Sequence, residues 1–93
     1  MSKYRLSEKA IDDIDLMYVY GVQVFGVDQA NRYQDQLFET FSRLADFPDI
    51  GIARSPGLRR FPHWPYIILY SHDEMKGLAI ETVLHGRQDW QRD

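Results

Sequence analysis

The sequence predicts an α+β fold in the order β-α-α-β-β-β, with a helical hairpin packed on one face of a small twisted antiparallel sheet. Two runs of β-branched and aromatic residues, 66–70 and 78–84, are bounded by turn formers, which is typical of an antiparallel meander. Before them, two long stretches carry apolar residues at intervals of three and four, the period of an amphipathic helix. The 93 residues suffice for one core, so we expect a single domain over 1–93.

The first elements are a short strand at residues 3–6 and a helix that begins near Glu8. Ser7 is suited to cap this helix, since its hydroxyl can accept a hydrogen bond from a free N–H group of the first turn. The apolar stripe of the helix consists of Ile11, Ile14, Tyr18, Gly21 or Val22, and Phe25. Three carboxylates, Asp12, Asp13 and Asp15, fall outside the stripe, and we expect them to form a solvated face.

A second helix follows after a link of a few residues. Gly26 ends the first helix, and Asp28 is expected to cap the second, so the two helices form an antiparallel hairpin. The apolar stripe of the second helix consists of Ala30, Tyr33, Leu37, Phe41, Leu44 and Ala45. Pro48 stops this helix near Asp46, because the residue before a proline is disfavoured in the helical region.

Residues 49–57 are expected to form a loop, with Ile50 and Ile52 packing it against the core. The meander consists of the strands 58–61, 66–71 and 78–85. Because side chains alternate between the faces of a sheet, Ile67 and Leu69 point away from the helices. We therefore expect the C-terminal tail, a second copy or a partner to cover this second apolar face.

Composition and charge exclude several classes of function. The net charge of −3 argues against binding through phosphate neutralisation, so we expect no direct sequence-specific contact with nucleic acid. The sequence has no cysteine and no apolar run near the roughly 18 residues of a membrane span. We expect a cytoplasmic protein that has no membrane partner.

The sequence contains no catalytic or metal-binding motif. Its three histidines lack the spacing of a metal site, no serine lies in a G-x-S-x-G context, and we expect neither a metal ion nor a cofactor. Arg59, Arg60 and Arg87 accompany aromatic residues of the meander, a combination that binds phosphate or an acidic protein patch. Equally, at least one of these arginines can be structural and pair with Glu81 across strands.

Two motifs stand out, Leu58-Arg59-Arg60-Phe61-Pro62-His63 with Pro65-Tyr66, and Val83-Leu84-His85-Gly86-Arg87 with Asp89. They resemble the RelE/ParE superfamily of toxins, and its ParE branch in particular. Weaker matches include Phe25-Gly26-Val27 and Phe47-Pro48 with Gly51. The resemblance implies the same fold and a hetero-oligomer with a cognate ParD-like antitoxin, whose C-terminal segment wraps the toxin.

The resemblance implies a toxin of a type II toxin–antitoxin module that inhibits DNA gyrase without catalysis. The alternative is a RelE-like ribosome-dependent mRNA endoribonuclease. The sequence departs from the nuclease pattern at Ile67 and Gln88, where basic residues are expected, and it ends before the position of the family's tail tyrosine. We therefore predict that the protein is not an enzyme.

The meander is thus interpreted as an interaction sheet shared by target and antitoxin. The residues predicted to bind the target are Arg59, Arg60, His63, Trp64, His85, Arg87 and Trp90. Those predicted to bind the antitoxin are Phe38, Phe61, Ile67 and Leu69.

Overall fold

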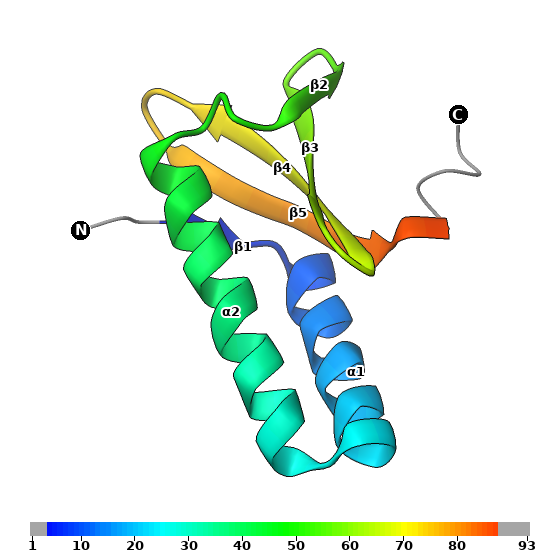
Figure 1. The fold of residues 1–93 in the computed structure, drawn as a ribbon. Helices are drawn as coiled ribbons and strands as arrows, with labels where there is room; N and C mark the ends of the chain where they lie inside the picture. The colour runs from blue at the N-terminus through cyan, green and yellow to red at the C-terminus, as the bar shows by residue number, and fades with distance from the viewer. Residues whose placement is uncertain (1–3, 88–93) are drawn as a thin grey trace.

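A computed structural model describes residues 4–87, in which two helices pack on a five-stranded sheet (Figure 1). The elements are β1 (Tyr4–Leu6), α1 (Glu8–Phe25), α2 (Val27–Asp46), β2 (Ile52–Ser55), β3 (Leu58–His63), β4 (Tyr66–Asp73) and β5 (Gly77–His85). The strand order is β1-β5-β4-β3-β2, and the predicted α+β class with its helical hairpin is confirmed. Within residues 4–87, no helix is long and apolar enough to cross a membrane.

Two features of the sheet were not predicted. β1 pairs with β5 in parallel, whereas the other neighbouring strands are antiparallel, so the sheet is mixed. The additional strand β2 lies within the expected loop 49–57 and pairs with β3. The expectation that Ile50 and Ile52 pack this segment on the core is wrong, because both side chains are exposed.

The segment before β2 is held by Tyr70 instead. The buried Tyr70 hydroxyl accepts a hydrogen bond from the Gly51 N–H group at 2.9 Å and donates one to the Pro48 carbonyl oxygen at 2.6 Å. A Cβ atom on Gly51 would lie 2.4 Å from this hydroxyl oxygen, so only glycine fits there. Hydrogen bonds to the Tyr70 hydroxyl thus hold this segment, in place of the predicted packing of Ile50 and Ile52.

A single residue, Gly26, links the two helices. Its φ of +92° is a conformation that glycine adopts readily, and its N–H group donates to the Val22 carbonyl oxygen while its own carbonyl accepts from Ala30. Asp28 lies within the first turn of α2, so its predicted capping role is wrong. The turn is therefore tight. The end of the hairpin that contains this turn extends beyond the sheet (Figure 1).

The start of α1 is attached directly to β5 by Ser7. Its hydroxyl accepts from the Ala10 N–H group at 2.9 Å, which confirms the predicted N-cap. The same residue donates to two consecutive carbonyl oxygens of β5, from its N–H group to Ile80 at 3.0 Å and from its hydroxyl to Glu81 at 2.6 Å. A β-bulge at Glu81 accompanies this double contact.

The core lies between the hairpin and one face of the sheet. Its buried side chains include Leu37, Phe41, Leu44, Ile68, Tyr70 and Ile80. On the other face, Ile67 and Leu69 are only 0% and 7% exposed. The second apolar face expected from the sequence is therefore not open to solvent at these two positions.

Candidate functional site

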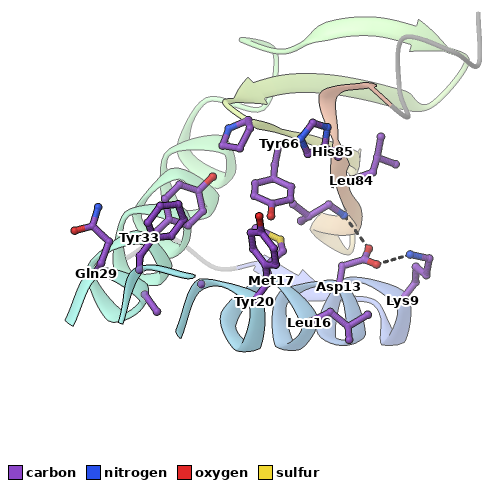
Figure 2. A pocket seen from close by; sticks show the side chains of 15 residues that line it. Lys9, Asp13, Leu16, Met17, Tyr20, Gln29, Tyr33, Tyr66, Leu84 and His85 are labelled. Atoms are coloured by element: carbon purple, nitrogen blue, oxygen red, sulfur yellow. Dashed lines mark hydrogen bonds and ion pairs between the residues drawn. The ribbon is translucent and has the colours of Figure 1, made fainter. Parts of the chain in front are cut away.

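A groove of about 840 Å³ runs between α1, the start of α2 and the adjoining ends of β4 and β5 (Figure 2). Much of its lining is apolar or aromatic and includes Met17, Gly21, Ala30, Tyr66, Val83 and Leu84. This volume is within the range of clefts that bind a ligand or a peptide segment. The groove is therefore the first candidate for a binding site.

The α1 wall of the groove is apolar although it faces solvent. Leu16 and Tyr20 line the groove, and Val24 follows one turn further along α1. All three side chains are more than half exposed, and that of Leu16 is 70% exposed. By contrast, the buried residues of α1 are only Ala10 and Ile14. Such a large exposed apolar surface is typical of an interface.

The opposite wall is the edge of β5. Asp13 contacts this edge beyond the point where β1 ends. β1 pairs with β5 only as far as Ile80. Beyond that point, the Asp13 carboxylate accepts from the Val83 N–H group at 3.0 Å and pairs with Lys9 (Figure 2). It also accepts from the Thr82 hydroxyl at 2.5 Å. The prediction of a solvated acidic face is therefore wrong for Asp13.

Three tyrosines provide polar groups within the groove. Tyr20 reaches from α1 towards Tyr66, and the rings of Tyr66 and Tyr33 lie 6.1 Å apart between centroids (Figure 2). Burial is the main cause that raises the pKa of both Tyr33 and Tyr66, so these hydroxyls stay protonated. The Tyr33 hydroxyl already donates to the His63 carbonyl oxygen at 3.1 Å. The groove can thus combine apolar contact with a few hydrogen bonds.

The groove borders a second cluster, at the end of the sheet. The Gly86 N–H group donates to the Pro65 carbonyl oxygen at 2.8 Å, which joins the β3–β4 turn to the end of β5. This contact brings together four of the residues predicted to bind the target, namely His63, Trp64, His85 and Arg87. We call these four residues the sheet-end cluster.

His63 occupies the buried side of the sheet-end cluster. Its Nδ1 atom lies 3.3 Å from the Thr40 hydroxyl, and its ring packs against Tyr33. Burial lowers the pKa of His63, which favours its neutral form. Within residues 4–87, no three His, Asp or Glu side chains form a group that could hold a metal ion.

Two further predicted target residues, Arg59 and Arg60, lie on β3 apart from this cluster. The Arg59 guanidinium donates to the Gly51 carbonyl oxygen at 2.7 Å and lies 3.5 Å from the Asp49 carboxylate, so it anchors the segment before β2. Arg59 is thus a structural arginine, but its partners are Gly51 and Asp49 and not Glu81, the partner that the sequence suggested. Arg60 follows it on the opposite face of β3, and Trp90 lies outside the described residues.

The four residues predicted to bind the antitoxin do not form one exposed surface. Phe38 and Phe61 are partly buried against the core, while Ile67 and Leu69 are buried. Antitoxin contact at these positions stays a prediction. Sequence reasoning missed the α1 wall, although apolar residues outside the predicted stripe of α1 were a visible signal. These residues are Leu16, Val19, Tyr20 and Val24.

Comparison with known proteins identifies the family. Residues 4–90 match a family described as the ParE toxin of the type II toxin–antitoxin system, parDE. The chain belongs to this family. It is similar to Toxin ParE1 of Caulobacter vibrioides, with 33% identity over 89% of this chain and 85% of the relative. Toxin ParE1 of Mycobacterium tuberculosis is 30% identical over 99% of this chain and 97% of the relative.

A solved structure supports the same fold. A chain described as belonging to the chromosomal ParDE TA system from P. aeruginosa superimposes with a TM-score of 0.75. The alignment covers 91% of this chain and 96% of the solved one, at 21% sequence identity. The resemblance inferred from the sequence motifs is therefore confirmed at the level of family and fold.

Proposed function

We propose that this member of the ParE family is a non-catalytic toxin with two adjacent binding sites. The sheet-end cluster contacts the target, which the resemblance to ParE toxins implies is DNA gyrase. The groove receives a segment of the cognate ParD-like antitoxin. The observation that carries this proposal is the apolar groove, whose exposed α1 wall lies beside the cluster.

The shape of the groove favours an amphipathic helix as its occupant. Leu16, Tyr20 and Val24 repeat every four residues, so they present a continuous ridge against which the apolar side of another helix can pack. The nearby outer surface of α1 is acidic, with Asp12 and Asp15 exposed. We therefore expect the antitoxin segment to carry basic residues where it passes the N-terminal half of α1.

The arrangement of the polar residues supports a non-catalytic mode of action. Cleavage of RNA requires cations near the scissile phosphate and a general acid or base within reach of it. Here the Arg59 guanidinium is directed to the segment before β2, and His63 is neutral and packed against Thr40. Ile67 occupies the position where nucleases of the superfamily carry a basic residue.

Assays with purified protein separate the two modes of action. We expect the protein to inhibit DNA supercoiling by gyrase and to cause DNA cleavage, and the antitoxin of the same module to reverse both effects. Cleavage of mRNA on programmed ribosomes serves as the parallel assay. Transcript cleavage with unaffected gyrase would contradict the proposal and favour the RelE-like alternative.

A further inference from the structure

The indole of Trp64 is exposed yet held in a defined position. Its side chain is 69% exposed, although the ring lies against the buried Gly86. A Cβ atom on Gly86 would lie 2.4 Å from Cζ3 of the indole and 3.2 Å from two further ring atoms. Such a distance is well inside van der Waals contact, so the ring rests directly on bare backbone.

The requirement for glycine at position 86 comes from the ring and not from the backbone. Among residues 4–87, positive φ angles occur only at Gly26, Gly57 and Gly77. An alanine could therefore adopt the backbone conformation of Gly86. Its methyl group would, however, displace the indole of Trp64. Gly86 thus controls where the exposed ring is presented.

We propose that Trp64 is the anchor that inserts into an apolar pocket of the target protein, and that Gly86 is the positioning residue for this anchor. This inference rests on the proposed function of the sheet-end cluster. Tryptophan and arginine are the residues most often found at the energetic centre of interfaces. A ring that is already held in place loses little conformational entropy when it binds.

The charge near the anchor indicates the chemistry of the pocket. Within the segments 63–66 and 85–87, Arg87 is the one Arg, Lys, Asp or Glu residue, and its side chain is exposed. We therefore expect a carboxylate at the rim of the pocket, placed to pair with Arg87. A protein is favoured over a nucleic acid because the net charge of the chain is −3.

The anchor can be tested separately from the antitoxin site. Pro65, Tyr66 and His85 line the groove, but Trp64 does not. Replacement of Trp64 should therefore weaken target binding and leave antitoxin binding intact. Phe47 provides a matched control, because this aromatic side chain is 61% exposed and follows α2, away from the sheet-end cluster.

The test compares Trp64→Ala, Gly86→Ala, the double variant and Phe47→Ala. We expect Trp64→Ala to raise the concentration needed for half-inhibition of gyrase by about 30-fold, the effect of a strong interface residue. Gly86→Ala should cause a smaller loss, and it should cause none in the Trp64→Ala background. Phe47→Ala should act like the unmodified protein, and all four should bind the antitoxin and melt cooperatively.

A spectroscopic measurement reports on the position of the ring itself. In a Trp90→Phe background, the fluorescence comes from Trp64 alone, since the chain has two tryptophans. Gly86→Ala should change its quenching by acrylamide, whereas Phe47→Ala should not. Unchanged quenching would overturn the positioning role of Gly86.

Growth arrest on expression separates this inference from the choice of target. If the unmodified protein arrests growth but leaves gyrase unaffected, the proposed target is wrong, and the four variants are then compared by growth arrest. Full toxicity of Trp64→Ala would overturn the anchor. Loss of its melting transition or of antitoxin binding would overturn it too, because Trp64 would then be structural.

Discussion

The two helices of the hairpin are similar in length but serve opposite purposes. α2 buries five residues and provides the large side chains Leu37, Phe41 and Leu44 to the core. α1 buries only Ala10 and Ile14, and most of its larger apolar side chains remain exposed. The comparison shows that α2 provides most of the large buried side chains of the hairpin, whereas α1 leaves an apolar surface exposed, where we propose that the antitoxin docks.

The largest expected effect is the loss of stability when a core residue of α2 is truncated. Phe41 is fully buried between α2 and the sheet, so Phe41→Ala should lower the free energy of unfolding by about 3–5 kcal/mol. Leu16→Ala on α1 should change it by less than about 0.5 kcal/mol, because Leu16 is 70% exposed. Denaturant unfolding measures both. Equal losses would show that α1 contributes to the core as much as α2.

A smaller effect is expected where α1 closes the edge of β5. Asp13→Ala should lower the free energy of unfolding by about 1–3 kcal/mol, because it leaves the Val83 N–H group without its acceptor. The neighbouring Asp12 is exposed, and Asp12→Ala should cost less than about 0.5 kcal/mol. If thermal unfolding shows no difference between the two variants, Asp13 does not attach α1 to the sheet.

The smallest expected effect is a pH dependence of the free energy of unfolding. It involves His63, which contacts α2. Burial lowers the pKa of His63 in the folded protein below the value of about 6.5 in the unfolded chain. The unfolded chain therefore binds more protons as the pH falls, and the stability associated with neutral His63 is lost from about pH 6.5 down to its folded pKa.

Melting curves at neutral and mildly acidic pH measure this effect. His63→Gln should melt with a smaller loss between the two pH values than the unmodified protein. His72→Gln is the control, because His72 is exposed near the end of β4. An identical pH dependence in the unmodified protein and His63→Gln would show that burial of His63 is not coupled to folding.

The sequence predicted those parts of the fold that local patterns determine. The cap at Ser7, the helix end at Asp46 and the core positions Phe41 and Ile68 all follow from periodicity or local chemistry, and the structure confirms them. β2 was missed because its four residues are mostly exposed and lack an alternating pattern. Its placement depends on Tyr70, which lies 15 or more residues away in the chain.

The candidate site was predicted only in part. His63, Trp64, His85 and Arg87 were all identified from the sequence, but the hydrogen bond from Gly86 to Pro65 that brings them together is a tertiary contact. The role of Asp13 was likewise hidden, since nothing local distinguishes it from the exposed Asp12. Asp13 is partly buried because it lies at the edge of β5, and the position of that edge is set by the tertiary fold.

Protection of single cysteines tests the central claim, that the exposed wall of α1 is the docking site of the antitoxin. The chain has no cysteine, so Leu16→Cys and Met75→Cys each create one reactive thiol, the latter at a side chain that is 93% exposed in the β4–β5 turn. We expect the antitoxin to slow maleimide labelling of Leu16→Cys at least tenfold and to leave Met75→Cys unchanged. Equal labelling of Leu16→Cys with and without bound antitoxin would contradict the account.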